Sequence, residues 1–305
     1  GYAQSTPQEF IDKAYELSSA GEIHEAMSLY DLAIGKFPDE PIFYTIKGGL
    51  MVHHIDHFAT NDNLYNAALK LFTKALQLDS TFAPAYNNRA LLNLYFQRYD
   101  LAVLDFTQVI NFSGNEDDRP SAMEDRATAK GYNKDYVGAI QDYEFLIKAH
   151  PDDVELYLNQ GVMYSSFKQL DSAMSQYKKG LAIDPQHPGL LNNMGMLMIR
   201  LENYDAAIVY LKKAIEVNPD EPFAYNNTGL ALVKLNKPKE ALEYIDRSLK
   251  LYPQNSYAYK NRAVALIAMG NRSEAWADLS SAVQLGYAKT YDDEVDKLMA
   301  KYCEK

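Results

Sequence analysis

Asparagine side chains recur in short, similar fragments along this sequence. The fragment AYNNTG begins at Ala224, and related fragments are AYNNRA from Ala85, LYLNQG from Leu156, LLNNMG from Leu190 and AYKNRA from Ala258. A carboxamide both donates and accepts hydrogen bonds, so a row of them can bond the main chain of an extended peptide without reading its side chains. The recurring amides therefore indicate either a peptide-binding surface or a structural bond between repeated elements.

Histidines suggest a second kind of chemistry. Three of the six histidines lie in MVHHIDH, residues 51–57. His53 and His57 are four residues apart on one helical face, with Asp56 next to His57, a spacing that can hold zinc or nickel. No fourth ligand is evident, and a polar helix end explains these residues equally well. His53 and His57 are thus weak metal candidates, and the sequence predicts no cofactor.

Enzyme motifs are missing from the sequence. The only His-Glu dipeptide, at His24, is followed by Ser28 where a zinc protease helix needs its second histidine. No nucleophile elbow, phosphate loop or pair of catalytic carboxylates can be defended, and scattered acidic residues are solvated by default. We therefore expect a protein that is not an enzyme.

Composition limits the partners. The 305 residues carry a formal net charge of -11, so the summed field gives nucleic acid no general attraction. The single cysteine, Cys303, excludes a disulfide framework within the chain. No apolar run approaches the roughly 20 residues needed to cross a bilayer, so no membrane insertion is expected. These properties leave a protein or a peptide as the expected partner.

The opening residues GYAQST, 1–6, are small and polar and lie outside any periodic pattern. They could be the end of a removed secretory signal, since a small residue near Ala3 suits signal peptidase. The chain would then be exported, to a periplasm or the extracellular space, and it would otherwise be cytoplasmic. We expect residues 1–6 to be an unstructured remnant.

Prolines reveal the period of the chain. Pro151, Pro185, Pro219 and Pro253 are each 34 residues apart, and each follows an apolar helical segment. A fixed period of this length is typical of a solenoid of helix-turn-helix units. With each proline at position 32 of its unit, the predicted units are 7–40, 41–82 with an eight-residue insertion, 83–119, 120–153, 154–187, 188–221, 222–255 and 256–289.

The pattern within these units resembles the tetratricopeptide repeat family. The unit from Val154 places the expected aromatic, small, large, small, aromatic and small residues at positions 4, 8, 11, 20, 24 and 27, as Tyr157, Gly161, Tyr164, Ala173, Tyr177 and Gly180. Lys130, at position 11 of the fourth unit, departs from the pattern, as do Gly114 and Tyr287 in place of prolines. The resemblance implies an all-α, right-handed superhelical solenoid of antiparallel helix pairs.

Each helix pair is too small to bury its own apolar face, so it must stack on the next pair. Small residues at positions 8 and 20 let the two helices approach closely. Residues 290–305 are expected to form a capping helix with Val295, Leu298 and Met299 inward. We expect the turns at Gly21, Asn203, Asn236 and Gly270, and N-caps of the second helices at Asp100, Asp171, Asp205 and Ser273.

The helical wheel places the asparagines on the face opposite the buried stripe. They occupy positions 5 and 6 of their units, as Asn87, Asn88, Asn159, Asn192, Asn193, Asn226, Asn227 and Asn261. The resemblance implies that this face lines a concave groove, where peptide-binding members of the family carry a similar asparagine ladder. Other groove positions hold Tyr95, Tyr132, Arg200 and Lys234.

Two interpretations of the ladder stay open. The amides could bind an extended peptide or partner segment, or position 6 could bond the backbone of a neighbouring unit. Under an alternative function, the chain is an assembly component that docks through its convex face or through the insertion in the second unit. A chaperone carboxylate clamp is not expected, because the only lysine at position 5, Lys260, has Val264 at position 9 where the clamp of this family needs asparagine.

The repeats also covary within the one sequence. Arginine occupies position 7 in three units, and the same three have aspartate at position 23, giving Arg89 with Asp105, Arg126 with Asp142 and Arg262 with Asp278. None of the other units has either residue. We therefore predict three structural ion pairs that join the two helices of a unit.

Overall fold

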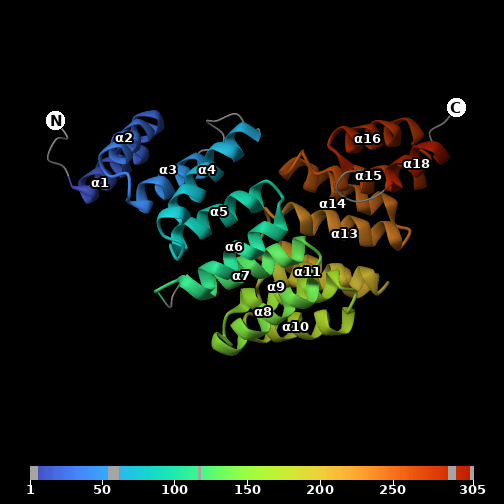
Figure 1. Ribbon diagram of the computed structural model, residues 1–305. Helices are drawn as coiled ribbons and strands as arrows, with labels where there is room; N and C mark the ends of the chain where they lie inside the picture. The colour runs from blue at the N-terminus through green and yellow to red at the C-terminus, as the bar shows by residue number, and fades with distance from the viewer. Residues whose placement is uncertain (1–5, 54–61, 116–117, 288–292, 303–305) are drawn as a thin grey trace. The chain divides into compact units, whose positions relative to one another are not determined.

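A computed structural model describes residues 6–53, 62–115, 118–287 and 293–302 (Figure 1). Over these residues the regular structure is entirely α-helical, and consecutive helices form pairs joined by short turns. The chain forms two compact units, Gly1–Pro151 and Asp152–Lys305. The helix content and the succession of helix pairs confirm the all-α repeat solenoid expected from the sequence.

Each unit is built from successive helix pairs. The first unit contains α1 (Pro7–Ser19), α2 (Ile23–Lys36), α3 (Pro41–His53), α4 (Asp62–Leu78), α5 (Ala83–Tyr95), α6 (Tyr99–Phe112), α7 (Asp118–Tyr132) and α8 (Tyr136–Ala149). The second contains α9 (Val154–Ser166), α10 (Leu170–Ile183), α11 (Pro188–Arg200), α12 (Tyr204–Val217), α13 (Pro222–Lys234), α14 (Pro238–Leu251), α15 (Ser256–Ala268), α16 (Arg272–Gln284) and α18 (Glu294–Tyr302). We infer that each pair from α1–α2 to α15–α16 is one repeat.

Close approach of the paired helices depends on small residues in the first helix. A Cβ atom on Gly161 would lie 2.3 Å from Cε1 of Tyr177, and one on Gly195 would lie 2.5 Å from Cγ of Leu211. Gly229 stands in the same relation to Ile245, at 2.3 Å from Cγ1. Large residues of the second helix therefore fill the space that these glycines leave, which is the packing that the repeat pattern predicts.

The turns inside the pairs use left-handed backbone. Gly21 and Gly270 have φ of 82° and 84°, and Asn236 has φ of 58°, as expected for these turn sites. At the other turns that the structure describes inside the pairs, the left-handed residue is Gln97, Lys134, Lys168 or Glu202.

Asn203 lies in the turn between α11 and α12, as predicted, but the predicted caps require correction. Glu202 takes the positive φ, and Asn203 is instead the N-cap of α12, accepting from the amide of Ala206. Each second helix begins directly after its left-handed residue and N-cap, so the residues predicted as caps lie two positions after the observed N-caps Arg98, Gln169, Asn203 and Asn271. Asp100, Asp171, Asp205 and Ser273 are all the second residue of their helix. There the three carboxylates still interact favourably with the helix dipole.

The first helix has a capping box, and the last helix packs onto the core of the last repeat. Thr6, which the sequence placed in an unstructured remnant, is the N-cap of α1 and forms a capping box with Glu9. At the other end, Val295 of α18 is buried, and Leu298 and Met299 pack against the same core cluster. Tyr287, in place of the expected proline, is buried and stacks on Tyr257 with ring centroids 6.2 Å apart.

All three predicted Arg–Asp pairs form. In each pair Nε and Nη2 donate to the two carboxylate oxygens, at 2.8 and 2.6 Å for Arg89, 2.9 and 2.8 Å for Arg126, and 2.8 and 2.7 Å for Arg262. The hydrogen bond to Asp278 raises the pKa of Arg262. Such forked bonds fix the spacing between the two helices of a pair.

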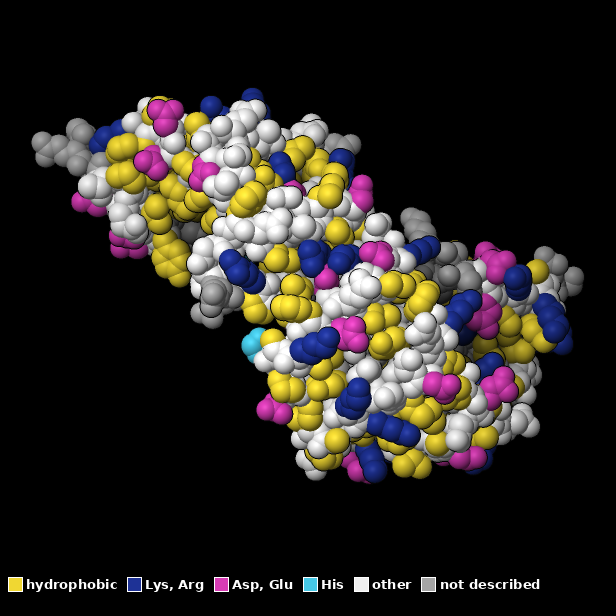
Figure 2. Space-filling view, turned by 60° about the horizontal axis from the view of Figure 1, so that its bottom comes forward, with side chains coloured by type: hydrophobic (Ala, Val, Ile, Leu, Met, Phe, Trp, Pro, Cys, Tyr) yellow, Lys and Arg dark blue, Asp and Glu magenta, His cyan; other side chains and the backbone are white. Residues whose placement is uncertain are grey.

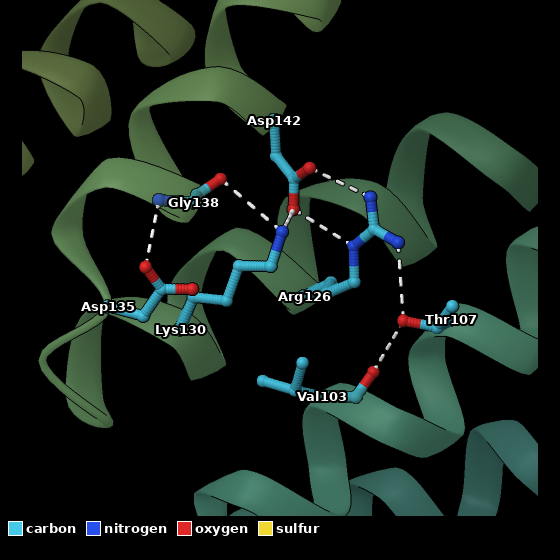
Figure 3. Close-up of polar contacts among 7 residues, drawn as sticks. All are labelled: Val103, Thr107, Arg126, Lys130, Asp135, Gly138 and Asp142. Carbon is cyan, nitrogen blue, oxygen red and sulfur yellow. Dashed lines mark hydrogen bonds and ion pairs between the residues drawn. The ribbon is translucent and has the colours of Figure 1, made fainter.

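Lys130 departs from the repeat pattern because it joins one of these pairs. Its Nζ lies 2.8 Å from Oδ2 of Asp142, so Arg126 and Lys130 both point at one buried carboxylate (Figure 3). The third guanidinium nitrogen of Arg126, Nη1, donates to Oγ1 of Thr107 at 3.2 Å, in the second helix of the preceding repeat. A polar junction thus replaces the apolar packing expected at this position.

Several sequence expectations fall wholly or partly outside the described residues. These are the leader remnant over residues 1–5, the insertion over residues 54–61, and residues 290–292 and 303–305 of the predicted cap. His53 ends α3 and is exposed, whereas Asp56 and His57 are outside the described residues, so the metal site stays a prediction. Among the helices that the structure describes, none is long and apolar enough to cross a membrane.

Candidate functional site

Amide side chains connect the first helices of successive pairs in the second unit. Asn227 donates from Nδ2 to Oδ1 of Asn192 at 3.0 Å, which joins α13 to α11. Asn261 donates in the same way to Asn226 at 3.0 Å, which joins α15 to α13. In both cases position 6 of one repeat bonds position 5 of the repeat before it. The row is therefore a chain of bonds from side chain to side chain.

Burial separates these amides from an open binding surface. Asn226 and Asn261 are each 1% exposed and Asn227 is 6% exposed. The structural interpretation of the sequence predicts a bond from position 6 to neighbouring backbone, whereas the two observed bonds go to a neighbouring side chain. At such buried sites an unpaired amide would be costly, so the bonds stabilise the stacking of the helices.

An ion pair continues the row at its carboxyl-terminal end. Lys260, at position 5 of the last repeat, is 4% exposed, and its Nζ lies 3.1 Å from Oε2 of Glu294 in α18. The ammonium also lies 4.5 Å from the ring centroid of Tyr257. Lys260 therefore serves the attachment of the capping helix.

The remaining candidate amides are half-buried. Asn87, Asn88 and Asn193 make no side-chain hydrogen bond with any part of the chain that the structure describes. Asn87 also lines a hollow of about 280 Å³ between the start of α5 and the start of α7. Asn159, at position 6 of its repeat like Asn88 and Asn193, is also half-buried. These side chains are the accessible part of the predicted ladder.

The other predicted groove residues are exposed. Tyr95 and Tyr132 are 51% and 62% exposed, and the ring of Tyr132 stacks on Tyr99 with centroids 5.2 Å apart. Arg200 donates from Nη1 to the carbonyl oxygen of Ser165 at 2.9 Å and to its Oγ at 2.6 Å. Lys234 ends α13 and is exposed. Arg200 is thus already held by the preceding first helix, whereas Tyr95, Tyr132 and Lys234 present accessible surface.

Charges do not gather by sign on the visible surface. On the face shown in Figure 2, basic and acidic side chains are interspersed among hydrophobic ones. The described residues contain no group of three or more histidines, cysteines or carboxylates that could hold a metal ion.

Asp125 replaces asparagine at position 6 of the fourth repeat, and burial raises the pKa of its carboxyl group. We expect Asp125→Asn to raise the free energy of unfolding at pH 7 by about 0.5 to 1 kcal/mol, because the amide avoids the penalty on a buried charge. That penalty applies above the folded-state pKa and vanishes below the unfolded value of about 4. Urea unfolding should therefore show a difference at pH 7 that shrinks toward pH 4. Equal stability of the two proteins at pH 7 would contradict this.

Comparison with known proteins agrees with the repeat architecture. One model of the tetratricopeptide repeat matches residues 187–254, and a second model of the same repeat matches residues 124–188 and 227–288. The matches together span residues 124–288, more than half of the chain. No curated protein matches the sequence.

Solved structures show the same fold. A tetratricopeptide repeat protein from Parabacteroides merdae ATCC 43184 is 17% identical, with a TM-score of 0.64 and a match that covers 97% of this chain and 99% of that one. The APC/C hetero-tetramer Cut9-Hcn1 contains a chain that is 14% identical, with a TM-score of 0.63, covering 97% of this chain and 55% of that one. MamA is 26% identical over 53% of this chain and 95% of its own, but the TM-score of 0.45 supports no inference.

Proposed function

Because the chain belongs to the tetratricopeptide repeat family, we propose that it is a non-catalytic scaffold that binds an extended peptide or partner segment along its first helices. Proteins of this family are generally non-catalytic and bind protein partners. Family membership therefore supports a general role as a protein–protein interaction scaffold. The finer proposal concerns where the segment lies and which side chains hold it.

The amide row contains side chains that bond each other and side chains that stay open, and this division supports the proposal. The bonded amides, Asn192 with Asn227 and Asn226 with Asn261, hold successive first helices at a fixed spacing. Asn193 follows Asn192 on α11, and its amide is not engaged by another described side chain. Rigid support beneath an open amide lowers the entropy cost of binding, because the side chain is already placed for a main-chain hydrogen bond.

Specificity would come from the side chains that flank the amides. Tyr95 and Tyr132 offer large amphipathic surfaces in the first unit, while Lys234 offers a cation in the second. Since the overall charge is -11, such a local cation would act on a bound segment at short range only. The proposed ligand is an extended protein segment and not a nucleic acid.

The alternative function is an assembly component that docks through its second helices. It is favoured by the exposure of large apolar side chains there: Phe145 of α8 is 61% exposed, Val209 of α12 55% and Trp276 of α16 50%. Isolated exposed apolar residues are common on protein surfaces, so these three carry less weight than the amide row.

Paired variants of the full chain distinguish binding from structural roles. We expect Asn193→Ala to lose partner binding with little change in stability. Asn227→Ala removes a buried bond to Asn192 and should lower the free energy of unfolding by about 1 kcal/mol. The measurements are capture of partners from the native source, identified by mass spectrometry, and urea unfolding of each variant.

A partner captured by the parent chain and by Asn227→Ala, but not by Asn193→Ala, would support the proposal. The same partners captured by Asn193→Ala and by the parent would refute groove recognition at this position. Residual binding through the first unit is controlled by adding Asn87→Ala and Asn88→Ala to the Asn193 variant.

A further inference from the structure

A hollow of about 600 Å³ opens on the second-helix side of the first unit, away from the amide row. It lies between α4 and α6, with α5 beneath it. Its walls combine Tyr65 and Leu69 of α4 with Leu101 and Leu104 of α6, and the guanidinium groups of Arg89 and Arg98 also line it. Leu104 is 61% exposed, so its side chain contributes an uncovered apolar rim.

Both arginines have unused hydrogen-bond donors at this hollow. The guanidinium of Arg98 lies 3.9 Å from the ring centroid of Tyr65 and has no hydrogen-bond acceptor among the described residues. Arg89 spends Nε and Nη2 on Asp105, which leaves its Nη1 without an acceptor in the same part of the structure. The contact with the Tyr65 ring holds the Arg98 guanidinium at the wall of the hollow without using its hydrogen-bond donors.

The other two arginines at this repeat position differ from Arg89. Nη1 of Arg126 donates to Thr107 at 3.2 Å, and Nη1 of Arg262 donates to Asp246 at 2.8 Å. Both acceptors occupy position 25 of the preceding repeat. Thr73 holds that position before Arg89 but does not bond it, so only this hollow keeps the donor open among the three described pairs.

The last repeat offers an internal comparison. A corresponding hollow of about 400 Å³ is lined by Arg262 together with three carboxylates, those of Asp246, Glu274 and Asp278. The hollow between α4 and α6 has two guanidinium groups and a single carboxylate, Asp105, which is already paired. The same place in the repeat is therefore cationic in the first unit and anionic in the last repeat.

We propose that the hollow between α4 and α6 is a docking site for a partner segment that carries an acidic side chain next to a large apolar one. The carboxylate accepts from Arg98 and from Nη1 of Arg89, which are charge-assisted bonds in a partly desolvated site. The apolar side chain covers Leu101 and Leu104. This site is separate from the amide row and does not depend on it.

A displayed library of short peptides tests the site on the full chain. In one pool, aspartate or glutamate is placed near leucine or phenylalanine, and in a matched pool the acid is replaced by its amide. We expect the acidic pool to be enriched about tenfold over the amide pool, as one charge-assisted contact would give. Arg98→Gln should abolish that preference, and Leu104→Glu should lower enrichment of the acidic pool by like-charge repulsion.

Arg272→Gln is the matched control, because Arg272 is an exposed arginine at the start of α16, the second helix of the last repeat. It should leave the preference unchanged. Equal enrichment of the two pools by the parent chain would overturn the proposal, as would an acidic preference that survives Arg98→Gln. Thermal unfolding of each variant shows that these exposed substitutions leave the fold intact, so a lost preference reports the site.

Discussion

Replacing Asp142 with alanine is expected to lower the free energy of unfolding of the first unit by about 3 to 5 kcal/mol. The carboxylate is buried and accepts two bonds from Arg126 and one from Lys130. Its removal leaves two cations partly buried without a counter-charge, which is among the most costly single changes in a protein core. Urea unfolding of the full chain, followed by circular dichroism, measures the loss.

Lys130→Leu provides the control for this prediction. Leucine restores the large apolar residue that the repeat pattern expects at position 11, and Asp142 keeps its forked bond with Arg126. We therefore expect a change of no more than about 1 kcal/mol in either direction. If Asp142→Ala costs as little as Lys130→Leu, the polar junction contributes little to stability and our account of it is wrong.

Gly229→Val is expected to cost about 3 kcal/mol through overpacking in the second unit. A Cβ atom at Gly229 would lie 2.3 Å from Cγ1 of Ile245 and 3.2 Å from the backbone carbonyl oxygen of Ala241, so both a side chain and a helix backbone must move. Thermal unfolding measures the change, which should appear as a lower melting temperature for the second unit.

The matched control is Gly35→Ala near the end of α2. A Cβ atom at Gly35 meets no atom within 4 Å, so alanine adds helix propensity without a clash. We expect this variant to be more stable by up to about 1 kcal/mol. If Gly229→Val unfolds at the same temperature as the parent chain, the repeat helices tolerate separation and the small-residue rule does not apply here.

The sequence predicts the repeat architecture well because the repeat pattern consists of small and large residues at fixed positions. Glycine or alanine at position 8 and large residues at position 24 are needed wherever the two helices of a repeat pack together. The 34-residue period is therefore recognisable even in repeats that depart from the pattern at other positions. The Arg–Asp pairs were predictable for a similar reason, since two charges that depend on each other appear and disappear together among the repeats.

The details that sequence reasoning missed depend on a single residue's backbone or on neighbours in another repeat. The N-caps were placed too late because nothing in the types of Lys168 or Glu202 marks them as left-handed. The partner of Asn227 was missed because a helical wheel places residues on one helix only, whereas Asn192 lies on another. The open Nη1 donor of Arg89 could not be predicted for the same reason. Thr73 is a threonine like Thr107, but it does not accept a hydrogen bond from Arg89 as Thr107 does from Arg126.

Photo-crosslinking in extract from the native source tests the central claim of a first-helix binding scaffold most directly. A photoreactive amino acid is introduced at Lys234, on the proposed binding face, and separately at Trp276, on the second-helix side. The account predicts a protein crosslink from position 234 that Asn193→Ala in the same chain removes. Crosslinks from position 276 alone, with none from position 234, would contradict it and assign the interaction to the second helices.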